Sequence, residues 1–271
     1  MLASQRHARI VERVAESGAV RVADLVSELA VSDMTIRRDI EQLARRGLLE
    51  RVHGGAVAIG HVGMPALPPS TDEPGFLAKS ALMQSAKRAI AAQAAELVDP
   101  GAAIALSAGT TTVELARQLR HVPDLTIVTN SIPAAQVLGD TAAISGHTVV
   151  LTGGTRTPSE ALVGPIAVGA LRTLHVDLLF LGCHGIDPRA GLTTPNLVEA
   201  ETNRALIGSA RSVCVVADHT KWGVIGLGTI VGLDAVDILI TDAGLAARGR
   251  EVLTDRIERV IIAAPRDAAT D

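Results

Sequence analysis

Short runs of apolar residues recur through the later part of the chain, and they limit the folds that this sequence can adopt. Each run is long enough for one strand, and stretches with helical spacing separate the runs. Strands that are apolar throughout are typical of parallel sheets covered by helices on both faces. The sequence therefore predicts the α/β fold class, with a doubly wound and mainly parallel sheet. A helix predicted over 76–98 precedes the strands of this sheet. The candidate strands are 102–107, 125–129, 148–152, 176–182, 212–217, 237–241 and 259–264.

The first part of the chain has a different pattern. Helical spacing of apolar residues predicts helices over 6–16, 22–30 and 33–46, and the alternating segment 48–59 contains a Gly-Gly turn typical of a β-hairpin. Three short helices followed by a hairpin indicate a winged helix-turn-helix. A proline-rich and glycine-rich stretch follows and predicts a linker. The predicted organisation is a DNA-binding domain over 1–59, a linker over 60–75, an α/β domain over 76–264 and a tail over 265–271.

Composition excludes several classes of protein. With 48% hydrophobic and 20% charged residues among 271, the chain has enough apolar area to fold, and its length favours two domains. One Trp, two Phe and no Tyr are too few for stacking single-stranded nucleic acid. Cys183 and Cys214 lie in apolar runs without partners, so we expect free thiols, no metal and no cofactor. Signal-peptide and membrane-helix patterns are missing, which predicts a soluble, cytoplasmic protein without a membrane partner.

The segment around Ser32 carries the strongest local signal. Ser32 is a good N-cap, which places the next three residues on the first turn of a helix, where a recognition helix meets base edges. Asp39 is expected to pair with an arginine or tether a neighbouring helix. An ordinary amphipathic helix with solvated arginines is the alternative, and the neighbouring hairpin argues against it. The predicted DNA-binding residues are Ser32, Asp33, Met34, Thr35, Arg37 and Arg38 on the helix, and Arg51 and His53 on the wing.

A second signal is the small-residue segment 107–112, which ends a predicted strand and begins a helix. The free N–H groups of a helix N-terminus and nearby hydroxyls suit an anion such as phosphate. A tight strand-to-helix turn without a ligand is the alternative. Other polar loops follow strands at 129–131, 153–154, 182–185 and 218–223, and the carboxyl ends of strands in an open α/β sheet converge on one crevice. Lys221 could neutralise a phosphate there, and Trp222 could either wall the pocket or simply pack.

The motifs together resemble one family. TIRRDI and LLERVHGGA resemble the DNA-binding domain of the DeoR family of bacterial transcriptional regulators, and SAGTTT, TIVTNS, LTGG, ALVGP, GLTTPN and ADHTKWG resemble its sensor domain. The resemblance implies a regulator, usually a repressor of carbohydrate metabolism genes, that is not an enzyme. It also implies a sensor domain similar to ribose 5-phosphate isomerases that binds a phosphorylated sugar or polyol. The implied effector-binding residues are Ser107, Gly109, Thr110, Thr111, Thr129, Asn130, Gly153, Gly154, Gly182, His184, Gly185, Glu199 and Lys221.

The implied partners are double-stranded operator DNA, the effector and further copies of the chain in a homo-oligomer. The net charge of −4 does not exclude DNA, because residues 1–57 hold 9 basic and 8 acidic residues whereas the remainder holds 16 and 21. Two alternatives stay open. One is an active sugar-phosphate isomerase with Glu199 as the base, and the other is a structural oligomer whose sensor domain has lost its ligand.

Overall fold

The computed structural model describes residues 3–17, 19–29, 31–45, 47–52, 54–57 and 76–264. The chain divides into two compact units, Met1–Pro68 and Pro69–Asp271. The predicted linker and tail lie outside the described residues. No described helix is long and apolar enough to cross a membrane.

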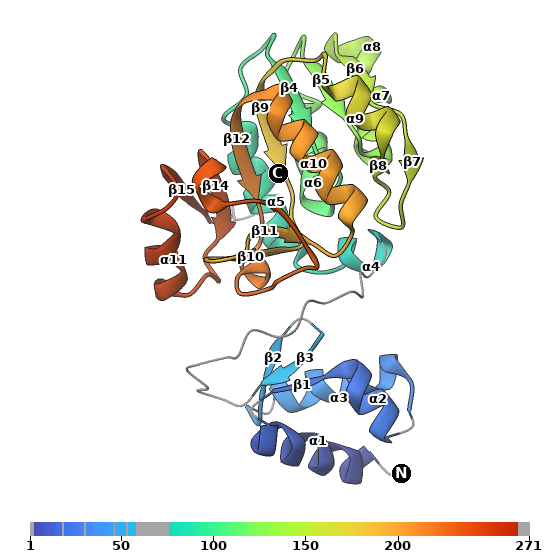
Figure 1. Cartoon of the computed structure of the whole chain (residues 1–271), viewed down its shortest axis with the longest axis vertical. Coiled ribbons are helices and arrows are strands. Elements are labelled where there is room, and N and C mark those ends of the chain that lie inside the picture. The colour runs from blue at the N-terminus through green and yellow to red at the C-terminus, as the bar shows by residue number, and fades with distance from the viewer. Residues whose placement is uncertain are drawn as a thin grey trace, which may run out of the picture. The chain divides into compact units, whose positions relative to one another are not determined.

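The described residues of the first unit form three helices and a small antiparallel sheet (Figure 1). The sheet has the order β1-β3-β2, in which β2 and β3 form the predicted hairpin. Strand β1 was not predicted, because three residues between two helices are too few to show an alternating pattern. The elements are α1 (Ala3–Ser17), β1 (Ala19–Arg21), α2 (Val22–Leu29), α3 (Asp33–Arg45), β2 (Glu50–Val52) and β3 (Gly55–Val57).

One hydrophobic core holds this unit together. Ile10 of α1, Leu25 of α2 and Ile36 of α3 are each at most 1% exposed and belong to one cluster. Gly55 fixes how the hairpin joins β1, because a Cβ at this position would lie 2.0 Å from the carbonyl oxygen of Val20. Only glycine permits so close an approach of two backbones.

The second unit is built on a seven-stranded sheet with the order β15-β14-β12-β9-β4-β5-β6, in which every pair is parallel. The order changes direction between β9 and β4, as in a doubly wound fold. All seven strands predicted from apolar runs are confirmed. They are β4 (Ala103–Leu106), β5 (Thr126–Thr129), β6 (Thr148–Leu151), β9 (Val176–Leu181), β12 (Ala210–Val216), β14 (Ile238–Asp242) and β15 (Arg259–Ala263).

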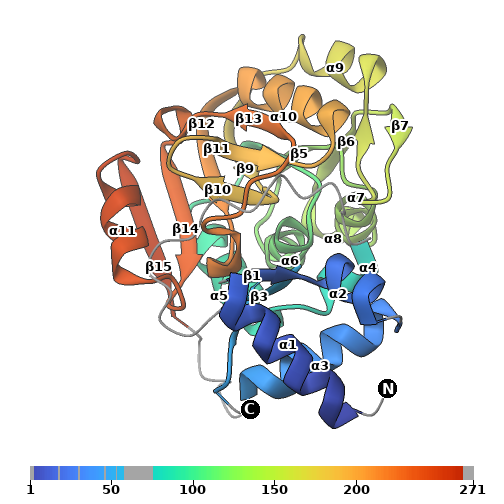
Figure 2. The same cartoon turned by 60° about the horizontal axis from the view of Figure 1, so that its bottom comes forward.

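Helices cover both faces of this sheet, which explains why its strands are apolar throughout. Phe180 of β9 packs in a core with α5, α6 and α7, whereas its neighbours Leu179 and Leu181 pack in a second core with α9, α10 and α11. Figure 2 shows α5 and α6 on one side of the sheet and α9 and α10 on the other. The helices are α5 (Gln84–Ala95), α6 (Thr110–Leu119), α7 (Ile132–Gly139), α8 (Ala142–Ser145), α9 (Pro165–Leu171), α10 (Leu197–Ser209) and α11 (Ala247–Thr254).

The expectation of one continuous helix over 76–98 is wrong. The segment forms α4 (Phe76–Ser80) and α5, separated by a turn in which Met83 has a left-handed φ of 51°. Neither glycine nor proline marks this break. Tertiary contacts hold α4 apart: the Phe76 amide donates to the carbonyl of Pro158 at 3.3 Å, and the Lys87 side chain donates to the carbonyl of Lys79.

Short strands beside the main sheet were also not predicted. Strands β10 (Gly185–Asp187), β11 (Gly191–Thr194) and β13 (Gly228–Val231) form an antiparallel sheet, and β7 (Thr155–Arg156) pairs with β8 (Leu162–Val163). β10, β11 and β13 contain glycine or threonine, and β7 and β8 have only two residues each, so these strands lack the longer apolar run that reveals the central strands. They matter because they continue from the loops at the carboxyl edge of the large sheet.

Candidate functional site

The first turn of α3 presents polar side chains at the surface of the first unit. Ser32 caps the helix, because its Oγ accepts the Thr35 amide at 3.3 Å and lies 2.8 Å from the Thr35 hydroxyl. Met34 is 77% exposed, and Arg37 and Arg38 are also exposed. An exposed, capped first turn followed by two arginines is suited to entering a major groove, where guanidinium groups contact guanine edges or phosphates.

Arg37 is held by a neighbour on the same helix. Its Nη2 donates to Asp33 Oδ2 at 3.3 Å, and its Nε donates to the other carboxylate oxygen. Both side chains are about half exposed, and such pairs contribute only about 0.3–0.5 kcal/mol. Asp33 therefore orients the guanidinium without holding it firmly, so that a DNA contact can replace the pair.

Asp39, on the inner face of the same helix, is buried and tied to α1. Arg6 donates to it from Nε at 2.5 Å and from Nη2 at 3.1 Å, and His7 Nε2 lies 2.9 Å from Oδ1. Burial acts to raise the pKa of Asp39, but the hydrogen bonds from Arg6 and His7 outweigh it and hold this pKa below its ordinary value. The expected tether between Asp39 and an arginine of the neighbouring helix is present.

The hairpin β2–β3 provides the wing. Gly54 makes the turn with a φ of +77°, a conformation that favours glycine. Arg51 on β2 is exposed to solvent, as a wing residue must be if it is to contact the DNA backbone. His53, the other predicted wing contact, lies outside the described residues.

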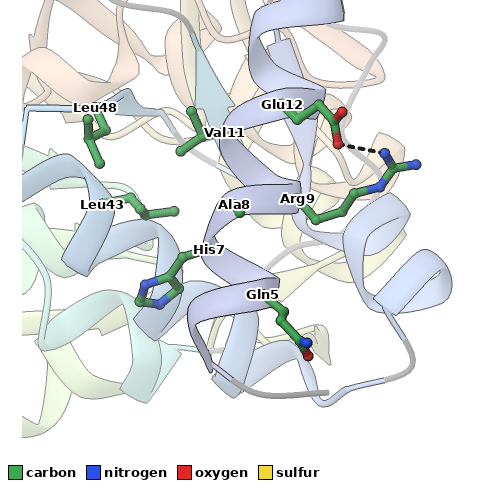
Figure 3. Close-up of a pocket in the computed structure, with 8 residues that line it drawn as sticks. All are labelled: Gln5, His7, Ala8, Arg9, Val11, Glu12, Leu43 and Leu48. Atoms are coloured by element: carbon green, nitrogen blue, oxygen red, sulfur yellow. Dashed lines mark hydrogen bonds and ion pairs between the residues drawn. The ribbon is translucent and has the colours of Figure 1, made fainter.

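The first unit also has a shallow hollow of about 770 Å³, beside α1 and the end of α3 (Figure 3). Val11, Leu43 and Leu48 give it an apolar floor, and Arg9 pairs with Glu12 at 2.7 Å on its rim. None of the predicted DNA-binding residues lines it. The hollow is therefore separate from the predicted recognition surface.

In the second unit, the loops that follow β4, β5 and β9 are hydrogen-bonded to one another. The Gly182 amide donates to Ser107 Oγ at 2.9 Å, and the Ala108 amide donates to Asn130 Oδ1 at 2.8 Å. Gly182 lies close to the first turn of α6, where a Cβ would be 4.0 Å from Thr112 Cγ2. The predicted convergence of these polar loops at the carboxyl edge of the sheet is thus present.

The N-terminus of α6 has no side-chain cap, since its N-cap residue is Gly109. Thr112 is fully buried, and its hydroxyl donates to the carbonyls of Ser107 and Gly109 at 2.7 and 2.9 Å. Thr110 is partly exposed and Thr111 is 7% exposed. No side chain therefore caps the first-turn amides, and the positive end of a helix dipole favours an anion.

Thr129 and Asn130 are buried, and protein groups use their polar atoms. Thr129 Oγ1 donates to the Leu106 carbonyl at 2.7 Å and accepts the Ser131 amide at 3.0 Å. The Asn130 side chain accepts the Ala108 amide and donates to the Leu162 carbonyl at 3.1 Å. These contacts hold the loops after β4 and β5 in place and connect them to β8.

Two of the remaining predicted glycines allow backbones to approach one another. A Cβ on Gly154, whose φ is +120°, would lie 2.5 Å from the Val163 carbonyl oxygen, and one on Gly185 would lie 2.0 Å from that of Val224. Gly153 is also left-handed, with a φ of 71°. Gly154 and Gly185 thus have a packing reason to be glycine that is independent of any ligand.

Glu199 and His184 are buried near the secondary strands. Glu199 accepts the Thr157 hydroxyl at 2.6 Å and that of Thr194 at 3.5 Å, so it joins α10 to the segment after β7 and to the end of β11. The His184 amide donates to the Thr193 carbonyl at 3.1 Å, which fixes the loop between β9 and β10.

Charged groups gather around the 3₁₀ turn His219–Lys221 that follows β12. Burial raises the pKa of the Cys183 thiol to about 12, and the nearby charges of Lys221 and Asp218 act on it in opposite directions. Cys183 is therefore an inert thiol at neutral pH. Trp222 packs on α11, because a Cβ on Gly249 would be 3.0 Å from its indole nitrogen. The packing alternative for Trp222 thus agrees with the structure.

Sequence reasoning missed Lys87, which is 4% exposed in the first turn of α5. Burial lowers the pKa of its amine to about 8, and the charges of Asp218 and Lys221 reach it. A signal was available in the sequence. Lys87 shares the apolar stripe of its helix with Ile90, Ala91 and Ala94, where a lysine is out of place. Among the described residues no cluster of three metal-ligating side chains occurs.

Comparisons with known proteins identify both units. Residues 6–62 match the DeoR-like helix-turn-helix domain, and residues 83–243 match the DeoR C-terminal sensor domain. The regulator GlpR of Haloferax volcanii is 39% identical over 93% of this chain and 94% of its own. The glycerol-3-phosphate regulon repressor of Escherichia coli K12 is 32% identical over 94% and 97%.

Likeness to solved structures is weaker. Ribose 5-phosphate isomerase from Plasmodium falciparum is 16% identical, with a TM-score of 0.39 over 54% of this chain and 56% of that one. This likeness is too distant to support a functional argument. The relatives above are named as regulators, which decides against the isomerase alternative. The chain belongs to the DeoR family of DNA-binding transcriptional regulators.

Proposed function

We propose that this regulator is a repressor of carbohydrate metabolism genes, and that a phosphorylated sugar or polyol bound at the carboxyl edge of the large sheet controls it. The relative from Escherichia coli K12 is named a repressor of a glycerol-3-phosphate regulon, which supports both the sign of regulation and the chemical class of effector. The observation that carries the proposal is the uncapped N-terminus of α6 beside the hydrogen-bonded loops at that edge.

On the DNA side, the recognition surface is the exposed first turn of α3. Met34 and the two arginines contact base edges and phosphates, Ser32 and Thr35 order the turn, and Asp33 presents Arg37. Arg51 and His53, which belong to the wing, contact the sugar-phosphate backbone of the DNA. Two such surfaces must fall on half-sites about 34 Å apart or a multiple of it, so the active form is a homo-oligomer.

On the effector side, the amides of Gly109, Thr110 and Thr111 receive the phosphate, and Lys221 neutralises it. Ser107 and Gly182 border the phosphate, whereas Glu199 and His184 face the hydroxyl-bearing part of the ligand. Thr129 and Asn130 act by holding the loops. Gly153, Gly154 and Gly185 act by letting backbone approach the ligand and neighbouring strands.

Control requires that the effector bind one arrangement of the oligomer more tightly than the other, since equal binding shifts nothing. We therefore expect the effector to weaken operator binding, and operator DNA to weaken effector binding by the same factor. A ligand with no regulatory role would not show this reciprocity, because its binding and the binding of operator DNA would not affect each other.

The experiment measures binding of the full chain to the DNA upstream of its own gene by fluorescence anisotropy, with and without a panel of sugar and polyol phosphates. Arg37→Ala should weaken DNA binding and leave phosphate binding unchanged. Arg45→Ala is its matched control, because Arg45 lies at the other end of α3 and its side chain is 70% exposed. Lys221→Ala should show the opposite pattern, with Arg172→Ala as control, since Arg172 is exposed and precedes β9.

Specific DNA binding that no phosphorylated compound changes would contradict the effector part of the proposal. DNA binding without sequence preference would contradict the operator part. Loss of both activities in both variants, with the folds intact, would contradict the assignment of the two activities to separate units.

A further inference from the structure

The ammonium of Lys87 is buried, and no carboxylate among the described residues pairs with it. Its Nζ donates to the backbone carbonyl of Lys79 at 2.5 Å, and no ion pair within 4.0 Å connects it to a carboxylate. It also lies in the first turn of α5, where the helix dipole disfavours a cation. An ammonium held in such a place costs folding free energy, so packing alone does not explain it.

The groups whose charges reach Lys87 come from three elements. Asp218 and Lys221 belong to the turn after β12, Glu114 lies on α6, and Lys79 lies on α4. Three of these five groups, including Lys87, are cationic and two are anionic. The cluster therefore has a positive balance, which an anion would satisfy. Lys221 and Asp218 also act on Cys183, whose neighbour Gly182 hydrogen-bonds to Ser107 in the loop before α6.

We propose that Lys87 is a contact for the anionic group of the effector, alongside Lys221, and that on binding its ammonium exchanges the Lys79 carbonyl for that anion. This inference rests on the function proposed above. It adds a ligand-binding residue that no motif marks, and it gives the ligand a direct connection to α4.

The exchange has a consequence for α4. This short helix packs against α6, and the Phe76 amide holds its other end at the Pro158 carbonyl. It is also the first described element after residues 58–75, which join the two units in the sequence. A ligand that takes the Lys87 ammonium from Lys79 therefore loosens the segment through which the DNA-binding unit is attached.

The test compares wild type, Lys87→Met and Lys87→Arg as full chains. Calorimetry measures binding of glycerol 3-phosphate and inorganic phosphate at pH 7 and pH 9. With a free-state pKa of about 8, the fraction of charged Lys87 falls about tenfold between these pH values, so wild-type affinity should fall by up to about tenfold. Lys87→Met should bind at least about tenfold more weakly at pH 7, because it lacks a charged hydrogen-bond donor. Its affinity should also change less with pH.

Lys87→Arg separates charge from shape. A guanidinium stays protonated over this range, so this variant should retain tighter binding than Lys87→Met and lose the fall between pH 7 and pH 9. Ionisation of phosphate itself affects all three proteins equally and cancels in the comparison. Lys87→Met should also fold at least as stably as wild type, because it removes a buried charge. Urea unfolding followed by Trp222 fluorescence measures this stability.

Hydrogen exchange of the peptide containing α4 tests the connection. Phosphate should speed exchange of this peptide in wild type, and Lys87→Met should exchange fast without phosphate. Equal affinity and equal pH dependence in wild type and Lys87→Met would overturn the inference and leave the proposed function standing. A wild type that binds no phosphate compound would overturn both. Weak binding by Lys87→Met together with marked loss of stability, and no rescue by Lys87→Arg, would indicate a purely structural role and also overturn the inference.

Discussion

Replacing Asp39 by alanine tests how the recognition helix is fixed to α1. The carboxylate, whose side chain is 7% exposed, receives two hydrogen bonds from Arg6 and one from His7. Removing one partner of a buried ion pair typically costs about 3–5 kcal/mol. Because the Arg6 side chain is 11% exposed and can recover some hydration, we expect a smaller loss of about 2 kcal/mol.

The assay is urea unfolding of the full chain, followed by far-ultraviolet circular dichroism and by fluorescence. Trp222 is the one tryptophan of the sequence and lies in the second unit. Its transition should stay unchanged while the helical signal of the first unit is lost at lower urea. Glu41→Ala is the matched control, because the exposed Glu41–Arg45 pair on the same helix contributes only about 0.3–0.5 kcal/mol. An Asp39→Ala loss no larger than that of the control would refute the reasoning.

The same network predicts a pH dependence. The folded pKa of Asp39 is lowered from 3.8, so its stabilisation is fully present above the unfolded pKa and is lost as the pH falls through the folded one. The difference in unfolding free energy between wild type and Asp39→Ala should therefore shrink as the pH is lowered from 5 towards 2. A difference that stays constant down to pH 2 would mean that the carboxylate is not the source of the stabilisation.

Three further variants test other parts of the structure. Phe180→Ala should destabilise the second unit by about 3–5 kcal/mol, because Phe180 is 0% exposed in its core, and the Trp222 transition should move to lower urea. Gly55→Ala should disorder the wing, since its Cβ would be 2.0 Å from the Val20 carbonyl oxygen, and amide exchange in β1 and β3 should accelerate. Asn130→Leu removes hydrogen bonds to Ala108 and Leu162, and should cost about 1–3 kcal/mol in the second unit. The role given to Phe180 would be contradicted by an unchanged urea midpoint, and that of Gly55 by unchanged amide exchange. The role of Asn130 would be contradicted if Asn130→Leu left the stability unchanged.

Local and periodic features of the sequence determined much of the architecture. The seven central strands were predictable because strands buried on both faces must be apolar along their whole length. The helices of the first unit and the Ser32 cap were predictable for a similar reason: helical spacing and capping depend on residues close together in sequence. The convergence of the polar loops followed from the rule that parallel strands end at one edge.

The tertiary structure alone decided the features that depend on contacts distant in sequence. The break between α4 and α5 has no local signal. It depends on two hydrogen bonds, one from the Phe76 amide to the Pro158 carbonyl and one from the Lys87 side chain to the Lys79 carbonyl. The strands β10, β11 and β13 are too short and polar to show a pattern. The burial of Thr129 and Asn130, and the pairing of Asp39 with Arg6, likewise required the fold. A sequence pattern records which side of an element is buried, but only packing determines which groups meet there and how their charges shift one another.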